Sequence, residues 1–204
     1  MITLYTYGTP NGYRASIALE ELGLPYEARV IDLAKGEHLS PEFARVNPVG
    51  KIPAIVDDGR AVFGSTAILY HLADKHGRLM PADPAARSQA HVWLAFAAGD
   101  LGPAVVSRYY FGTRAEEKLP AAIAHFDCET GRCMRALEGG LREARYLAGD
   151  EYSMADVAVF PFIAVLAAMV PGFLDELPHT RRWLDDVAAR PAVARGMAVP
   201  PPAV

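Results

Sequence analysis

The feature that most constrains the fold is a change of pattern along the chain, where two prolines lie in RLMPADPAA (78–86). Before this stretch, strand-like and helix-like patterns follow one another in the order β-α-β-α-β-β-α. After it, helical patterns fill almost all of the remaining chain. Strands connected through helices are typical of a mixed sheet covered by helices. The sequence therefore predicts an α/β domain over residues 1–77, a linker over 78–84 and an all-helical domain over 85–204.

Turn and cap residues mark the elements of the first domain. Asp58-Gly59 is a hairpin signal between two strands within residues 51–64. Ser65 is expected to be the N-cap of the following helix, and Gly23 to end the first helix. The remaining elements are predicted as strands over 2–7 and 26–33, helices over 14–22 and 65–77, and a short helical turn over 42–48.

An apolar stretch in the second domain, residues 157–174, is the best candidate for a membrane span. It contains two prolines and a glycine, and it follows a helix capping box formed by Ser153 and Asp156. We therefore interpret it as a buried core helix instead of a membrane span. Helical patterns in this domain cover residues 85–111, 116–144, 154–170 and 178–189.

The composition limits the classes of function. Of the 204 residues, 51% are hydrophobic and 22% charged, as in a folded globular protein. The net charge of −4 and the lack of long basic runs argue against a nucleic-acid or membrane partner. No signal-peptide pattern opens the chain, so a cytoplasmic protein is expected. Cys128 and Cys133 point about 140° apart on a predicted helix and are not expected to pair. No histidine spacing is typical of a metal site, and no metal is expected.

Two small polar residues, Thr9 and Asn11, lie in the turn GTPNG between the first strand and the first helix. Such a turn either only separates two elements or also binds an anion, because a helix N-terminus has free N–H groups and a positive dipole end. A thiolate held there would be stabilised by the dipole and by hydroxyl or amide donors.

Three further residues of the first domain point to ligand binding. Pro53 interrupts the strand-like run KIPAIV, which indicates either a trans proline at a sheet edge or a cis bond that turns the backbone of Ile52 outward. Ser65 either only caps its helix or also helps to bind a carboxylate at the helix N-terminus. Lys51 is either a surface lysine or a cation for an acidic ligand.

In this order and spacing, these stretches resemble the cytosolic glutathione S-transferases, most closely the nu class of disulfide-bond reductases. The resemblance covers nearly the whole chain. It implies a thioredoxin-like N-terminal domain followed by an all-α domain, glutathione as co-substrate without a metal, and a symmetric homodimer. The matching stretches are TPNGYRASIALEELGLPYEARVIDL (9–33), SPEFARVNPVGKIPAIVDD (40–58), GSTAILYHLADKHG (64–77) and LAGDEYSMADVAVFPF (147–162).

The resemblance also implies roles for individual residues. Thr9 would donate its hydroxyl to the glutathione thiolate, and Asn11 an amide N–H to the same sulfur or to a neighbouring carbonyl. Ile52, with Pro53 cis, would pair with the cysteinyl backbone of glutathione. Lys51 and His38 would lie near the glycyl carboxylate, and Ser65 would bind the γ-glutamyl carboxylate. Arg132 either reaches the glutathione site or is a solvated helix arginine.

One position departs from the pattern of the family. An acidic or amide residue usually precedes the serine, whereas here Gly64 precedes Ser65. Glycine has no side chain to hold the γ-glutamyl amino group of glutathione. A lost charge-assisted hydrogen bond is worth about 1.5–3 kcal/mol, which is about ten- to hundredfold in affinity.

Three hypotheses for the function follow. In the first, the bound glutathione thiolate attacks a small disulfide and a second glutathione completes the exchange. In the second, the thiolate attacks a carbon electrophile. In the third, the chain is a non-catalytic scaffold with this fold, which Gly64 would favour, whereas Thr9 and Asn11 favour an enzyme. Residues 109–111, two tyrosines and a phenylalanine, either line the second-substrate site or pack between subunits.

Overall fold

The computed structural model describes residues 1–200 and divides into two compact units. The first unit comprises Met1–Met80 together with the described residues from Asp185 onward, and the second comprises Pro81–Leu184. Residues 201–204 of the predicted second domain lie outside the described part of the chain. No helix among residues 1–200 is long and apolar enough to cross a membrane.

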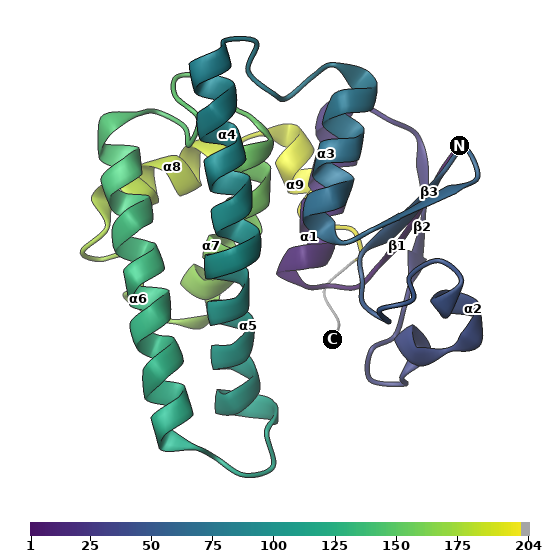
Figure 1. Cartoon of the computed structure of the whole chain (residues 1–204). Helices are drawn as coiled ribbons and strands as arrows, with labels where there is room; N and C mark the ends of the chain where they lie inside the picture. The colour runs from purple at the N-terminus through teal and green to yellow at the C-terminus, as the bar shows by residue number, and fades with distance from the viewer. Residues whose placement is uncertain (201–204) are drawn as a thin grey trace. The chain divides into compact units, whose positions relative to one another are not determined.

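The first unit is built on a four-stranded mixed sheet with the strand order β2-β1-β3-β4. Strand β1 pairs in parallel with β2 and antiparallel with β3, and β3 pairs antiparallel with β4. Helices α1 and α3 lie side by side on one face of this sheet, and α2 lies on the other side (Figure 1). The elements are β1 (Ile2–Thr6), α1 (Pro10–Leu22), β2 (Tyr26–Val30), η1 (Glu37–Leu39), α2 (Pro41–Ala44), β3 (Ala54–Asp57), β4 (Arg60–Phe63) and α3 (Ser65–His76).

The predicted order of strands and helices in this unit is confirmed. Asp58 and Gly59 both have positive φ, of 50° and 78°, which is the backbone of the two-residue turn that their sequence predicts. Two boundaries were wrong. Helix α1 begins at Pro10, so Asn11 lies in its first turn, and the N-cap position of α3 is occupied by Gly64 instead of Ser65.

A short helix near the C-terminus, α9 (Pro191–Met197), completes the first unit and was not predicted. It packs against α1 so closely that a Cβ on Gly196 would lie 2.5 Å from the Cα atom of Ile17. The Ser16 hydroxyl donates to the Gly196 carbonyl at 2.7 Å. Only glycine permits this approach of two backbones.

The second unit is all-helical, as predicted. The single helix predicted over residues 85–111 is interrupted by two π-helical stretches, which a 3.6-residue periodicity does not resolve. The elements are α4 (Pro84–Phe96), η2 (Ala97–Leu101), α5 (Gly102–Tyr109), η3 (Tyr110–Arg114), α6 (Pro120–Glu143), α7 (Met154–Met169) and α8 (Pro178–Ala188), the last of which continues past the boundary of the unit.

Helix α7 forms the core of this unit, as its apolar sequence predicts. The capping box of Ser153 and Asp156 is present at its N-terminus. The Asp156 carboxylate also accepts from the Leu147 N–H at 3.0 Å and from the Trp183 indole N–H at 2.8 Å. One buried side chain therefore joins the start of α7, the preceding loop and α8. Burial raises the pKa of Asp156 to about 6.

Candidate functional site

The predicted thiol-binding turn leads from β1 into α1. Thr9 is the N-cap of α1, and its Oγ1 accepts a hydrogen bond from the Gly12 N–H at 3.2 Å. A hydroxyl that accepts one bond still has its own proton to donate, so Thr9 is able to act on a ligand while it caps the helix. Gly12 allows the tight turn, because a Cβ there would lie 2.2 Å from the Tyr7 carbonyl oxygen.

Asn11 in the first turn of α1 is joined to Ser65 at the start of α3. The Ser65 hydroxyl donates to Asn11 Oδ1 at 3.0 Å, although the two residues are 54 positions apart in the sequence. The site therefore lies where the N-termini of two helices meet, and both positive dipole ends point into it. Asn11 and Ser65, two of the residues predicted to bind glutathione, are therefore in direct contact.

A residue that the sequence reasoning missed, Arg14, lies beneath this contact. Its side chain is buried and donates to Ser65 Oγ at 2.8 Å, to Thr66 Oγ1 at 2.9 Å and to Asn11 Oδ1 at 3.3 Å. Burial lowers the pKa of the guanidinium to about 10, so Arg14 remains charged at neutral pH. No local signal distinguishes Arg14 from a surface arginine, since most of its partners come from α3.

The N-terminus of α3 has the features of a carboxylate site. Gly64 holds the N-cap position without a side-chain hydrogen bond, and the first turn contains no acidic residue. The first N–H groups of a helix have no partner within it and attract anions. The nearby guanidinium of Arg14 adds a full positive charge. Gly64 itself has φ 87° and ψ 123°, a conformation that favours glycine.

Ile52 lies in the loop before β3. The Ile52-Pro53 peptide bond is cis, as the resemblance implied, and the Gly64 N–H donates to the Pro53 carbonyl at 3.2 Å. The Asn47 side chain supports this loop, since its amide donates to the Lys51 carbonyl and accepts from a backbone N–H two residues ahead. Among residues 1–200, the backbone hydrogen bonds outside helices and strands include none from Ile52.

His38 and Lys51 occupy neighbouring segments of the first unit. A Cβ on Gly50 would lie 3.1 Å from the His38 carbonyl oxygen, so η1 packs against the loop that leads to Lys51. Lys51 is exposed. The Nδ1 atom of His38 is buried and has no hydrogen-bond partner within residues 1–200. The exposed Lys51 side chain is therefore open to a ligand in this region, whereas the buried Nδ1 atom of His38 is not.

Arg132 belongs to the second unit and lines a cleft of 610 Å³ there. Its side chain is 65% exposed and forms an ion pair with Glu129 at 3.0 Å. Its implied contact with glutathione stays a prediction. The cleft is lined by Phe96, Gly99, Asp100, Pro103, Ala104, His125, Phe126, Glu129, Arg132, Cys133 and Ala136.

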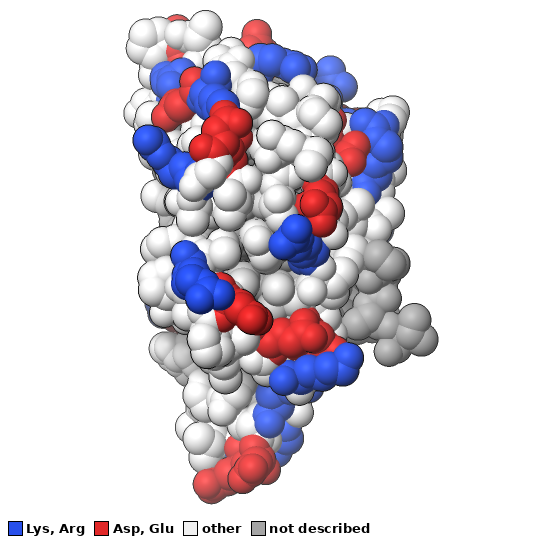
Figure 2. Space-filling model, turned by 90° about the vertical axis from the view of Figure 1, so that its right-hand side faces the viewer, with Lys and Arg blue, Asp and Glu red and all other residues white. Residues whose placement is uncertain are grey.

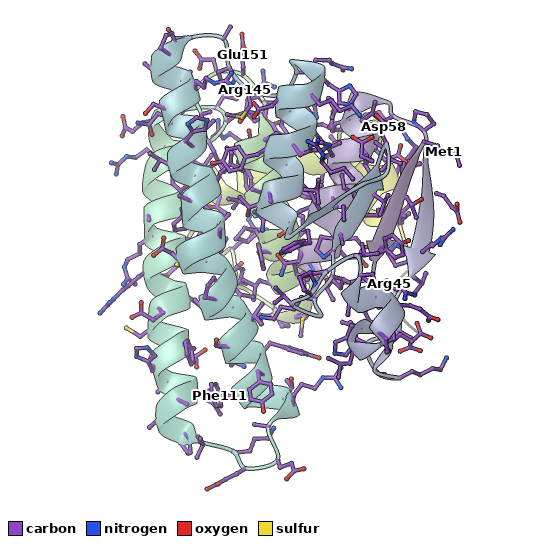
Figure 3. All side chains as sticks on the ribbon, turned by 45° about the vertical axis from the view of Figure 1, so that its right-hand side comes forward. Met1, Arg45, Asp58, Phe111, Arg145 and Glu151 are labelled. Carbon is purple, nitrogen blue, oxygen red and sulfur yellow. The ribbon has the colours of Figure 1, made fainter. Side chains whose placement is uncertain are left out.

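The side chains near the end of α5 differ in their surroundings. Tyr109 and Tyr110 are exposed. Phe111, which is labelled in Figure 3, stacks on Phe126 with 5.7 Å between ring centroids. The structure thus gives Phe111 a packing role within its own unit and leaves the two tyrosines open to solvent.

Cys128 and Cys133 are both free, and burial raises the pKa of the Cys133 thiol. No group of histidine, cysteine or carboxylate side chains within residues 1–200 is suited to hold a metal ion. Acidic and basic side chains are interspersed on the face drawn in Figure 2, and the described residues visible on that face form no extended area of one sign.

The fold and the site define a protein with a thioredoxin-like unit, a helical unit and two helix N-termini that are joined by a hydrogen bond from Ser65 to Asn11. The chain belongs to the glutathione S-transferase family. Residues 1–74 match the family described as "Glutathione S-transferase, N-terminal domain", and residues 109–191 match "Glutathione S-transferase, C-terminal domain". The family and the fold that the sequence resemblance implied are therefore confirmed.

Curated relatives include two disulfide-bond oxidoreductases of Escherichia coli. The chain is 34% identical to YfcG over 97% of its own length and 94% of that protein. It is 37% identical to YghU over 97% of its own length and 74% of that protein.

Solved structures with the same fold contain glutathione. A glutathione transferase from Burkholderia graminis, with two glutathione molecules bound per subunit, has a TM-score of 0.89 and 38% identity over 98% of this chain and 88% of that one. A glutathione transferase from Pseudomonas putida, with one glutathione disulfide bound per subunit, has a TM-score of 0.91 and 35% identity over 98% and 91%.

Proposed function

We propose that this chain is a glutathione-dependent disulfide-bond reductase that activates a bound glutathione thiol. The observation that carries the proposal is the joined pair of helix N-termini, where Thr9 and Asn11 can donate to a sulfur and the start of α3 can hold a carboxylate. Neither Thr9 nor Asn11 is a nucleophile or a strong base. The nucleophile is therefore the thiolate of glutathione, and the protein lowers the pKa of that thiol.

The reaction consists of two thiol-disulfide exchanges. The bound glutathione thiolate attacks one sulfur of a small disulfide RSSR, so that a G–S–S–R bond forms and RS⁻ leaves. A second glutathione thiolate then attacks the glutathione sulfur of G–S–S–R, which yields glutathione disulfide and a second RS⁻. Each leaving thiolate takes up a proton, and two glutathione molecules have been oxidised for one disulfide reduced. No protein cysteine takes part, which suits a chain whose two cysteines are Cys128 and Cys133 in the helical unit.

The rest of the glutathione molecule would be held along the first unit. The backbone of Ile52, which forms none of the loop hydrogen bonds among residues 1–200, would pair with the cysteinyl residue as an added strand pairs with a sheet edge. Lys51 and His38 would meet the glycyl carboxylate, and Ser65 with the first turn of α3 would meet the γ-glutamyl carboxylate. We also propose that Arg132 of the helical unit contributes to this site.

The relatives support this choice among the hypotheses. Two of them are named disulfide-bond oxidoreductases, and a solved relative was obtained with glutathione disulfide, the product of the proposed reaction. Conjugation of a carbon electrophile would use the same thiolate, so it remains the alternative. Gly64 is the feature that favours a non-catalytic scaffold.

We further propose that the chain forms a homodimer and acts in the cytoplasm. Exposed apolar side chains on consecutive helices of the second unit, Val92 on α4 with Val106 and Tyr109 on α5, are suited to a subunit interface. A reaction that consumes reduced glutathione needs a compartment that keeps glutathione reduced.

Calorimetric titration with reduced and with oxidised glutathione, run beside an assay with 2-hydroxyethyl disulfide, tests the function. We expect dissociation constants from micromolar to low millimolar, and tighter binding of the oxidised form. The double variant Thr9→Ala, Asn11→Ala should lose about 10²- to 10³-fold in rate if both donors act on the thiolate. A chain that binds no glutathione at several millimolar would be a scaffold. A chain that binds it but transfers it only to carbon electrophiles would be a conjugating transferase.

A further inference from the structure

The buried side chain of Arg14 has no part in the reaction as proposed above, yet it joins both halves of the site. It is only 2% exposed and lies between the N-termini of α1 and α3. One terminal nitrogen donates to Asn11 Oδ1 and Ser65 Oγ, and the other donates to Thr66 Oγ1. A planar guanidinium is able to reach three acceptors in this way, whereas the ammonium of lysine is a point charge with a different geometry.

The contacts of Arg14 determine which way the Asn11 amide points. Arginine only donates hydrogen bonds, so the Asn11 atom that faces it at 3.3 Å is the carbonyl oxygen. The Ser65 hydroxyl accepts from Arg14 and gives its only proton to the same oxygen. The amide is planar, and therefore its NH₂ group is directed away from both partners.

Without these contacts, nothing would favour this orientation strongly. The last torsion of an asparagine side chain is broad and roughly two-fold, so the amide is able to present either its oxygen or its nitrogen to a ligand. An oxygen facing a thiolate repels it, whereas an N–H donor stabilises it. The identity of the atom that meets the sulfur thus depends on what holds Asn11 from behind.

We propose that Arg14 is a positioning residue, which fixes the Asn11 amide so that its NH₂ group faces the glutathione sulfur and couples this thiol site to the carboxylate site at α3. The inference rests on the proposed function, since it needs a glutathione thiolate at the turn. Ser65 carries the coupling, because it bonds both Arg14 and Asn11 and begins the helix that would hold the carboxylate.

The test is the thiol pKa of bound reduced glutathione, measured from the ultraviolet absorbance of the thiolate as the pH is raised at saturating glutathione. Arg14→Met should raise this pKa by about one unit and lower disulfide reduction at neutral pH about tenfold. Arg14→Lys keeps the charge but cannot match all three acceptors, so an intermediate shift is expected. If Arg14 acts through Asn11, then Arg14→Met should shift the thiol pKa no further in an Asn11→Ala background.

A matched control separates positioning from stability. Arg190 is another partly buried arginine of the first unit, and it bonds Glu21 of α1 at 2.6 and 2.9 Å, away from Asn11. Arg190→Met should lower the melting temperature and leave the thiol pKa of bound glutathione unchanged. If Arg14→Met and Arg14→Lys lower the melting temperature but also leave that pKa unchanged, Arg14 is only structural and the inference is wrong.

Failure of the proposed function is seen separately, in the unsubstituted protein. If that protein binds no glutathione, or binds it with the thiol pKa of free glutathione, the proposed function is wrong and the inference falls with it. If the unsubstituted protein lowers the thiol pKa, only the variants at Arg14 decide the inference. Should Arg14→Met fail to fold, Arg14→Lys and its combination with Asn11→Ala give the same decision.

Discussion

Gly64 offers a direct test of how this site holds glutathione, through the substitution Gly64→Glu. Gly64 lies at the N-cap of α3, next to Ser65, where the family usually has an acidic or amide side chain. Apart from the two neighbouring residues, no atom lies within 4 Å of the position that a Cβ would take, so the first atom of a side chain has room there. A carboxylate added there would be able to meet the γ-glutamyl ammonium, and such a bond is worth about 1.5–3 kcal/mol. We expect reduced glutathione to bind about 10- to 100-fold more tightly.

The same substitution should reduce the stability of the protein. At φ 87° and ψ 123°, a residue with a Cβ adopts an unfavourable backbone conformation that costs about 1–3 kcal/mol. For a chain of this size, the melting temperature should therefore fall by about 2–12 °C. Gly64→Ala carries the same backbone cost without the carboxylate, and it is the matched control for both measurements.

Calorimetry with two ligands isolates the carboxylate–ammonium contact. Gly64→Glu should gain affinity for reduced glutathione relative to Gly64→Ala, but not for glutaryl-cysteinyl-glycine, which lacks the α-amino group. Equal gains for both ligands, or none for either, would refute the assignment of this contact. A melting temperature that is unchanged in Gly64→Ala would refute the reasoning on the backbone.

Three further predictions concern stability and assembly. Asp156→Ala should lower the free energy of unfolding by about 3–5 kcal/mol, measured by urea denaturation, because several buried donors lose their acceptor; a loss below about 1 kcal/mol would contradict this. Burial raises the pKa of Asp57, but hydrogen bonds from Lys75 and a neighbouring histidine outweigh it and hold that pKa below its ordinary value of 3.8. A carboxyl group with a lowered pKa stabilises the fold at pH values above 3.8, and this contribution is lost in acid. Lys75→Met should therefore lower the melting temperature at neutral pH, and the difference in melting temperature between the variant and the unsubstituted protein should close below pH 3.8. A difference in melting temperature that does not depend on pH would contradict this prediction. Val106→Arg, on an exposed apolar position of α5, should yield monomers in sedimentation velocity, whereas unchanged dimers would place the subunit interface elsewhere.

Local signals in the sequence predicted much of the fold. The Asp58-Gly59 turn and the Ser153–Asp156 capping box involve only near neighbours, and both occur as predicted. Elements that depend on tertiary packing were missed. Helix α9 is short, and it is held by the close approach of Gly196 to α1. The hydrogen bond between Ser16 and Gly196 joins residues that are 180 positions apart in the sequence. The π-helical stretches each differ from an α-helix by a change of hydrogen-bond partner that leaves the apolar pattern almost intact.

The candidate site shows the same division. The residue types at Thr9, Pro53 and Ser65 indicated a ligand because each has an unusual place relative to a strand or helix end. Their partners could not be predicted, since the contact from Ser65 to Asn11 spans 54 residues. Arg14 was missed for this reason, as an arginine near the start of a helix usually faces water. Its burial becomes visible only when α3 is placed against α1.

Gly64 and Arg14 together determine the charge of the site. Two helix N-termini and a buried guanidinium are all positive, and Gly64 supplies no carboxylate to balance them. Such a site favours the anionic forms of glutathione, its thiolate and its carboxylates, while it leaves the ammonium group without an acidic partner from the first turn of α3. We therefore expect weak binding of glutathione and a lowered pKa of its thiol to occur together, as two results of one charge distribution. It follows that Gly64→Glu should tighten the binding of glutathione and at the same time raise the pKa of its thiol. If the thiol pKa stays constant while the affinity rises, the two halves of the site do not interact electrostatically, and the effect of Arg14 on the sulfur is confined to the orientation of Asn11.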